Sequence, residues 1–216
     1  MQAEPSRPPP ARSPAADAVR GRLMSGLSAV VAGKGYAAAT IADIVREARV
    51  SKRTFYQHFA DKEACFLASY GAASDRILGV IAAAADAESV QDRIHAATVA
   101  YFAALEAEPA LTRSFLVEIH GAGGRALELR RDVHRRFAEL LRRLVKSARR
   151  EDPTIQPLGA HMATALVGAI NELVMVALEQ SGGKRLHELV GTAEALVRAV
   201  LVAPRSPSRG ELSRRS

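Results

Sequence analysis

Residues 51–63, SKRTFYQHFADKE, combine cationic, amide and aromatic side chains whose chemistry suits a nucleic acid. Arg53 can donate two hydrogen bonds to guanine O6 and N7, and Gln57 can pair bidentately with adenine. Lys52 can reach a phosphate or a guanine, and Tyr56 offers a hydrogen bond to a phosphate. The same residue types also occur on an ordinary amphipathic helix with a charged exposed face. The surrounding elements therefore decide between the two interpretations.

Two short helices are expected around this stretch, over residues 41–48 and 52–58, joined by a turn of about three residues. Their expected N-cap residues are Thr40 and Ser51. Phe55 and Phe59 lie four positions apart on one face of the second helix, where they would hold it against its neighbours. The polar residues would then face outward together. This spacing is typical of a helix-turn-helix, whose second helix enters the major groove of DNA.

The rest of the sequence also predicts helices, because Ala, Leu, Glu and Arg dominate and no segment alternates as a strand would. Asp17 is the expected N-cap of the first helix, which Gly33 and Gly35 end, and Asp61 is the expected N-cap of the fourth. Further helices are expected over residues 61–85, 89–107, 109–120, 123–150, 157–181 and 185–202. The predicted organisation is a disordered arm over 1–16, a helix-turn-helix domain over 17–60, a larger helical domain over 61–203 and a disordered tail over 204–216.

Composition sets the class of protein. The chain has 216 residues, a net charge of +7 and 48% hydrophobic residues, as expected of a soluble protein that either binds an anionic partner or carries arginine-rich solvated faces. A single Cys excludes a disulfide framework, and no secretory signal leads the chain, so a cytoplasmic location is expected. The apolar run over residues 162–178 contains Asn171 and Glu172, which favours a buried helix over a membrane span.

Residues 35–66, GYAAATIADIVREARVSKRTFYQHFADKEACF, carry a pattern that resembles a known family. The matching elements are Gly35-Tyr36, Thr40, Ile41-Ala42, Ile44, Ala48, Val50-Ser51, Lys52, Thr54-Phe55-Tyr56, His58-Phe59 and Lys62-Glu63. This pattern is similar to the N-terminal signature of the TetR family of bacterial transcriptional regulators. The family commonly has Gly in the turn where this chain has Arg49, and a positive φ there would cost a non-Gly residue roughly 1 kcal/mol.

The resemblance implies an all-α fold, with a three-helix helix-turn-helix DNA-binding head followed by a larger helical ligand-binding and dimerisation bundle. It implies DNA contacts at Thr40, Ser51, Lys52, Arg53, Thr54, Tyr56, His58 and Lys62, and helix geometry adds Gln57. It also implies a ligand-responsive dimeric regulator, most often a repressor, whose partners are a palindromic DNA operator and a small-molecule effector.

The C-terminal bundle offers weaker signals. The expected pocket residues are Phe66, Tyr70, Phe102, Phe115, Phe137 and Met175, with Glu118, Asn171 or Glu172 as polar anchors. The apolar helices over 157–181 and 185–202 are expected to form half of the four-helix bundle of a homodimer, with an intrachain core as the alternative. The arginine-rich helix over 125–150 is interpreted as a solvated face, with a second nucleic-acid surface as the alternative.

The sequence carries no Walker loop and no G-x-S-x-G motif, so neither catalysis nor a cofactor is expected. His95, His120, His134 and His161 lack the spacing of metal ligands, and Cys65 is expected to be a buried small hydrophobe. Two rival functions remain open: a helical enzyme or small-molecule carrier with an incidental helix-turn-helix, and a nonspecific DNA binder that uses the arginine-rich helix.

Overall fold

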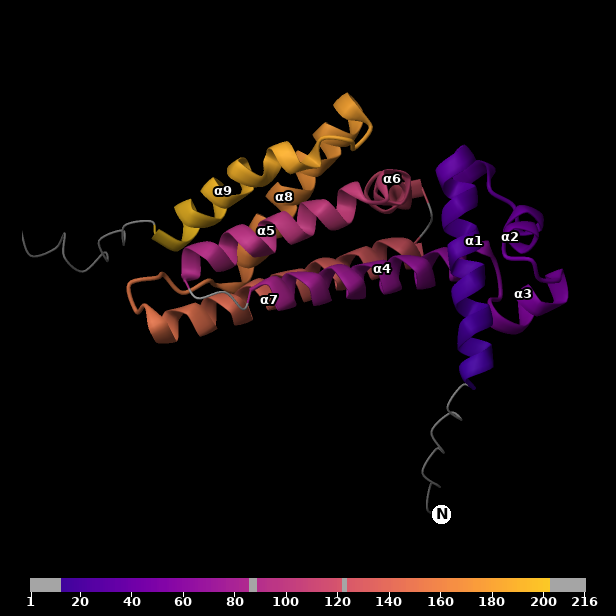
Figure 1. Ribbon diagram of the computed structural model, residues 1–216, viewed down its shortest axis with the longest axis horizontal. Coiled ribbons are helices and arrows are strands. Elements are labelled where there is room, and N and C mark those ends of the chain that lie inside the picture. Colours follow the sequence, from indigo (N-terminus) through magenta and orange to yellow (C-terminus); the bar gives the residue numbers. More distant parts are fainter. Residues whose placement is uncertain (1–12, 86–88, 122–123, 203–216) are drawn as a thin grey trace, which may run out of the picture. The chain divides into compact units, whose positions relative to one another are not determined.

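A computed structural model of the protein describes residues 13–85, 89–121 and 124–202, which form helices and no strand. Figure 1 shows the elements in order. They are α1 (Pro14–Ala38), α2 (Ile41–Glu47), α3 (Lys52–His58), α4 (Lys62–Ala84), α5 (Val90–Glu106), α6 (Pro109–Leu116), the 3-10 turn η1 (Glu118–Gly121), α7 (Gly124–Glu151), α8 (Ala160–Ser181), the 3-10 turn η2 (Leu186–Leu189) and α9 (Val190–Val202). The predicted all-α fold is confirmed.

The chain forms two compact units that divide after Ser69, inside α4. The sequence predicted this boundary after residue 60, just before α4 begins. The first unit therefore contains α1, α2 and α3 and also the first turns of α4. The predicted disordered segments over residues 1–12 and 204–216 lie outside the described residues.

α1 begins earlier than the sequence predicted. Its N-cap is Ser13, whose side chain accepts a hydrogen bond from the backbone N–H of Ala16, and Pro14 occupies the first helical position. Asp17 is therefore a residue of the first turn and not the cap, and residues 14–16 are helical and not part of an arm. Gly35 interrupts the helix with a φ of 79°, the backbone region that glycine adopts without strain.

α2 begins with a capping box. The hydroxyl of Thr40 accepts from the backbone N–H of Asp43, and the carboxylate of Asp43 accepts from the backbone N–H of Thr40. Lys34 and Arg46 also donate to this carboxylate. The hydrogen bond from Lys34, followed by that from Thr40, holds the pKa of Asp43 well below its usual range. The capping predicted at Thr40 is confirmed, and it fixes where α2 starts.

The core of the first unit is built where α1 crosses α2. Leu23, Leu27, Ile44 and Phe55 are fully buried there. A Cβ placed at Gly26 would lie 3.0 Å from the carbonyl oxygen of Ile44 and 3.1 Å from the backbone nitrogen of Ala48. The absence of a side chain at this position lets the two helices approach backbone to backbone, which sets the angle at which α2 and α3 are presented.

Cys65, from the first turn of α4, is also fully buried in this unit. Burial raises the pKa of its thiol to about 12, so the reactive thiolate is scarce near neutral pH. The expectation of a buried small hydrophobe is confirmed.

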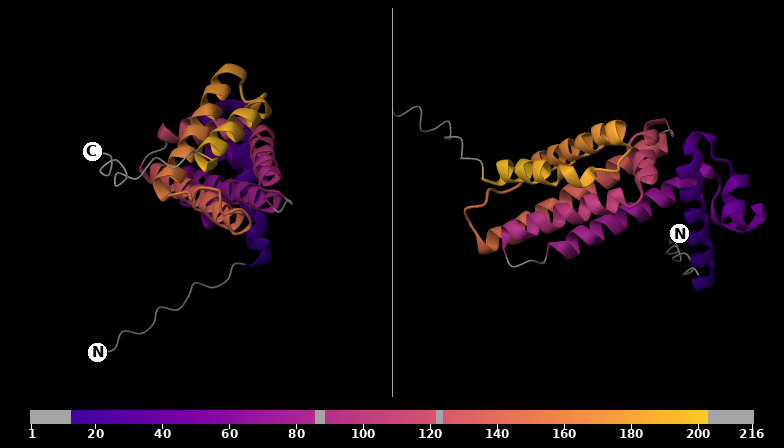
Figure 2. Two further views of the ribbon diagram at one scale, coloured as in Figure 1. Left: turned by 90° about the vertical axis from the view of Figure 1, so that its left-hand side faces the viewer. Right: turned by 45° about the horizontal axis from the view of Figure 1, so that its top comes forward.

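The second unit is a helical bundle with two apolar clusters, and Figure 2 shows it from two further directions. One cluster joins α7, α8 and α9 through residues such as Val145, Leu166 and Leu201. The other joins α5, α8 and α9 through residues such as Phe102 and Val174. α8 ends at Gly182, which adopts the left-handed conformation expected of a helix C-terminus.

α4 and α8 are long and apolar enough to cross a membrane by length and composition, a test that core helices of soluble proteins also pass. In α8 the buried face includes Ala163, Leu166 and Val174. The opposite face exposes small and apolar residues, with Met162 50% and Val176 41% exposed. The small residues Ala165 and Gly168 of α8 and Gly191, Ala195 and Ala199 of α9 are exposed as well.

Candidate functional site

α3 is held in place by its own cap and by its aromatic face. The hydroxyl of Ser51 accepts a hydrogen bond from the backbone N–H of Thr54 at 3.0 Å, which confirms the predicted N-cap. Phe55 is fully buried and Phe59 is 4% exposed, with ring centroids 5.8 Å apart. The prediction that both aromatic side chains face inward is confirmed. Their anchoring turns the remaining face of α3 outward.

Arg20 of α1 clamps the end of α3. Its guanidinium lies 4.2 Å from the ring centroid of Phe59 and donates to the carbonyl oxygen of His58 at 3.2 Å. Cations near a helix C-terminus interact favourably with its unpaired carbonyl groups. This contact joins α1 to α3 across 38 positions of sequence. No local pattern in the sequence predicted it.

The turn between α2 and α3 is a Schellman motif. The N–H of Val50 donates to the carbonyl oxygen of Val45 at 3.0 Å, and the N–H of Arg49 donates to that of Arg46 at 3.2 Å. Arg49 has a φ of 53°. The positive φ considered from the sequence is therefore present, with Arg where glycine is the usual residue.

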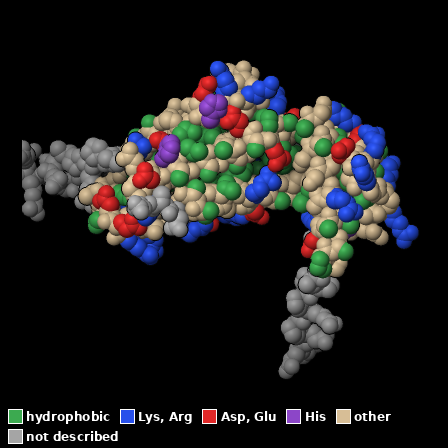
Figure 3. Space-filling model, viewed as in Figure 1, with side chains coloured by type: hydrophobic (Ala, Val, Ile, Leu, Met, Phe, Trp, Pro, Cys, Tyr) green, Lys and Arg blue, Asp and Glu red, His purple; other side chains and the backbone are tan. Residues whose placement is uncertain are grey.

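The outward face of α3 presents four side chains that have no hydrogen bond or ion pair within the described chain. They are Lys52, Arg53, Tyr56 and Gln57, and all four are exposed. The Tyr56 side chain is 57% exposed although its ring lies edge-on to Phe55 at 5.6 Å. Figure 3 shows Lys and Arg side chains gathered over α2 and α3. This face, which we call the recognition face, leaves its donors and acceptors available to a polar partner.

The other residues predicted to contact DNA are placed differently. Thr40, Ser51 and Thr54 take part in caps, although Thr40 and Ser51 remain exposed. His58 is half-buried at the end of α3. These four residues border the recognition face, and their contacts with DNA stay predictions.

Lys62 is engaged within the protein. Its ammonium group donates to the carbonyl oxygens of Tyr36 at 2.9 Å and Ala39 at 2.8 Å, and lies 4.4 Å from the Tyr36 ring centroid. Burial, followed by the nearby charge of Lys34, lowers the pKa of Lys62. These contacts hold Lys62 against the end of α1, and its contact with DNA stays a prediction.

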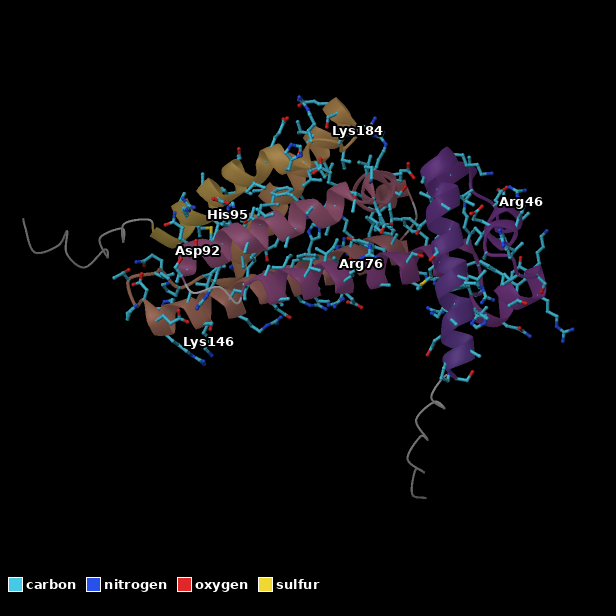
Figure 4. The ribbon with its side chains drawn as sticks, in the orientation of Figure 1. Arg46, Arg76, Asp92, His95, Lys146 and Lys184 are labelled. Carbon is cyan, nitrogen blue, oxygen red and sulfur yellow. The ribbon has the colours of Figure 1, made fainter. Side chains whose placement is uncertain are left out.

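The second unit contains a partly open cavity of about 130 Å³. Its walls come from α4 to α9 and are mostly apolar, with aromatic rings from Tyr70, Tyr101, Phe102, Phe115 and Phe137. Five predicted pocket residues line it: Tyr70, Phe102, Phe115, Phe137 and Asn171. Among the described lining residues, the charged side chains are Arg76 and Glu108, which pair with each other at 2.8 Å. Figure 4 labels Arg76 on α4.

Three polar side chains from three helices meet at the cavity. The hydroxyl of Tyr101 (α5) donates to Asn171 Oδ1 (α8) at 3.2 Å, and Asn171 Nδ2 lies 2.9 Å from His134 Nε2 (α7). In this orientation of the Asn171 amide, its nitrogen donates and His134 Nε2 accepts. Burial, followed by the proximity of Tyr70, raises the pKa of Tyr101. Burial likewise raises the pKa of Tyr70 to about 12, so both hydroxyls stay neutral.

Four predicted pocket residues lie outside the cavity lining. Phe66 is fully buried in the first unit, where its ring packs 4.3 Å from that of Tyr36. Glu118 accepts a hydrogen bond from Ser114. Glu172 is exposed, because one position along a helix turns a side chain by about 100° from its buried neighbour Asn171. Met175 packs against the apolar cluster of α5, α8 and α9.

Tyr101 and His134 line the cavity although neither was predicted as a pocket residue. Tyr101 and Asn171 are separated by 70 positions, and Asn171 and His134 by 37. One signal in the sequence could have indicated Tyr101 as a pocket residue: it bears a hydroxyl group and lies next to Phe102 in a largely apolar part of α5. In the part of the chain that the structure describes, no group of three His, Cys, Asp or Glu side chains is placed to hold a metal ion.

Comparisons with known proteins agree with this architecture. Residues 23–69 match the family model described as bacterial regulatory proteins, tetR family. The fold is similar to that of the fatty acid degradation regulator FadR from Bacillus halodurans, at 19% identity and a TM-score of 0.72, covering 91% of this chain and 99% of that one. FadR from Bacillus subtilis, solved in complex with stearoyl-CoA, has 12% identity and a TM-score of 0.71, with 84% and 98% covered.

A TetR-family transcriptional regulator from Pectobacterium atrosepticum has 23% identity and a TM-score of 0.69, covering 90% of this chain and all of that one. The comparison with curated protein sequences finds no match. The resemblance predicted from residues 35–66 is confirmed by the family match, and the solved structures extend the likeness in fold over the second unit.

Proposed function

We propose that this chain, whose residues 23–69 match the model of the tetR family of bacterial regulatory proteins, is a dimeric, ligand-responsive transcriptional regulator, a repressor released from its operator by a small-molecule effector. The observation that carries the proposal is the recognition face of α3. Its four exposed polar side chains have no partner among the described residues, and they stand on a helix whose position is fixed from beneath. Such a face suits the base edges and phosphates of a major groove.

Each recognition residue has a distinct role in this proposal. Arg53 reads guanine and Gln57 reads adenine, because both present bidentate groups. Lys52 and Tyr56 contact phosphates, together with Thr40, Ser51, Thr54 and His58 at the border of the face. We assign Lys62 a positioning role, because its ammonium group is already bound to carbonyl oxygens of α1.

Dimerisation through α8 and α9 is part of the proposal. The exposed side of these helices consists largely of small and apolar residues, including Ala165, Gly168 and Ala195. Small residues permit close approach of a partner helix, and burial of Met162 and Val176 would remove apolar surface from water. Two copies related by a two-fold axis would present two recognition helices to a palindromic operator. A cytoplasmic location follows from this role.

The direct test is selection of bound fragments from random DNA by the full-length protein. We expect enrichment of a palindrome with two half-sites one helical turn, or a multiple of it, apart. Enrichment of no sequence, with binding governed by salt alone, would contradict the proposal and would indicate a nonspecific DNA binder. Binding of a small molecule with no binding to any DNA would indicate a carrier.

A further inference from the structure

We propose that the cavity of the second unit takes an uncharged, mainly apolar molecule with one hydroxyl or carbonyl group, which is hydrogen-bonded at the Tyr101–Asn171–His134 cluster. Binding of this class of ligand is a property of the second unit. Its action as the effector rests on the proposed function.

The charges of the lining disfavour an ionised ligand group inside the cavity. Arg76 and Glu108 already pair with each other at 2.8 Å, and no other Asp, Glu, Lys or Arg side chain is among the described lining residues. A buried carboxylate or ammonium without a partner costs several kcal/mol. A charged group inside the cavity would remain unpaired among aromatic rings, because the Arg76 and Glu108 side chains are paired and are themselves 60% and 43% exposed.

The hydrogen-bonding capacity of the cluster favours one neutral polar group. Tyr101 uses its proton on Asn171 Oδ1, and Asn171 uses one amide proton on His134 Nε2. The Tyr101 oxygen can still accept, and the second amide proton of Asn171 can still donate. A hydroxyl group on the ligand can use both, and a carbonyl can use the donor. Of the other hydroxyls at the cavity, Thr98 donates to Ile94 at 2.7 Å and Thr112 to Leu105 at 2.9 Å, while Tyr70 and Ser74 also line the cavity without belonging to this cluster.

The size of the cavity suggests a ligand of medium length. One water molecule needs about 10–15 Å³ of cavity volume. A volume of 130 Å³ therefore has room for roughly ten non-hydrogen atoms in a chain or small ring system. The aromatic walls supply apolar contact along the whole length. A medium-chain alcohol such as 1-decanol fits these requirements.

The test compares 1-decanol with decanoate, which differ at the polar end. At pH 7.5 decanoate is ionised. The full-length protein would be loaded with the neutral fluorescent dye N-phenyl-1-naphthylamine, and each compound would be titrated as a competitor below its aggregation concentration. We expect decanol to bind at least tenfold more tightly than decanoate. Equal binding, tighter binding of decanoate or no competition by decanol would each overturn the inference.

Two variants locate the polar group. Y101F removes the hydroxyl and keeps the ring contacts with Phe102 and Phe137. N171L makes the cluster apolar. Loss of one hydrogen bond predicts decanol binding about three- to tenfold weaker in either variant. The matched control is T98V on the same helix as Tyr101, because the Thr98 hydroxyl is used by its own helix. Unchanged decanol binding in both Y101F and N171L, with the dye still bound, would overturn the placement.

The same samples separate this inference from the proposed function. Binding of the selected DNA fragment is measured by fluorescence anisotropy with and without decanol. A protein that selects a palindrome but prefers decanoate keeps the proposed function and overturns the ligand class. A protein that prefers decanol but selects no DNA sequence keeps the ligand class and contradicts the proposed function.

Discussion

The recognition face and the cavity handle their polar groups in opposite ways. On α3, Lys52, Arg53 and Gln57 are exposed and have no hydrogen bond or ion pair within the described chain. In the cavity, Tyr101, Asn171 and His134 bond to one another among aromatic rings. Exposed unpaired groups suit a highly charged, hydrated partner, whereas a few mutually bonded polar groups among aromatic rings suit a mostly apolar one. The difference indicates what kind of partner each unit binds.

The largest expected effect concerns the scaffold beneath the recognition face. G26L forces a side chain against the backbone of α2, so the free energy of unfolding should fall by about 2–3 kcal/mol, as measured by urea denaturation. G33L is the matched control. Gly33 lies on the same helix as Gly26, and a Cβ placed there would have no neighbouring atom within 4 Å. If both variants have the same stability, the close approach of α1 and α2 does not position α3.

The next effect concerns base reading. R53A should weaken binding to the selected operator by about 1–3 kcal/mol and relax the preference at one position of each half-site. Repeating the site selection with the variant measures both changes. A uniform loss across all sequences would instead place Arg53 on a phosphate.

Lys62 distinguishes positioning from contact. K62M keeps the aliphatic stem but removes the hydrogen bonds to α1, so the free energy of unfolding should fall by about 1 kcal/mol. The slope of log affinity against log salt should be unchanged. A slope reduced by about 1, with stability retained, would return Lys62 to the phosphate contacts.

The smallest effect is at the turn. R49G removes the strain that a positive φ imposes on a non-glycine residue, so the free energy of unfolding should rise by about 0.5–1 kcal/mol. R49K keeps the charge and the strain and serves as the control. A weaker salt dependence in R49G but not in R49K would show that the Arg49 charge also contacts a phosphate.

The first unit was largely predictable because its signals are local. The caps at Thr40 and Ser51 and the inward Phe55 and Phe59 follow from spacings of three or four positions. The cap at Ser13 was missed because Asp17 offered a similar signal one turn later. This error concerns only the first turn of α1.

The cavity was less predictable because tertiary packing builds it. Tyr101, His134 and Asn171 come from three helices, and no spacing in the sequence links them. Phe66 was placed in the pocket because α4 was assigned wholly to the bundle, whereas its first turns belong to the first unit. The spacing of apolar residues along a helix predicts which of them face the core. It does not predict which part of that core remains an open cavity.

The central claim is that the recognition face distinguishes DNA sequences. The most direct measurement is fluorescence anisotropy of the K52A/R53A/Y56A/Q57A variant on the selected palindrome and on a scrambled duplex. The control R142Q/R143Q/K146Q removes three exposed cations from α7, and Figure 4 labels Lys146 there. We predict that the α3 variant keeps its helical circular dichroism but loses the difference between the duplexes, whereas the α7 control retains it. An α3 variant that still prefers the palindrome would contradict the account.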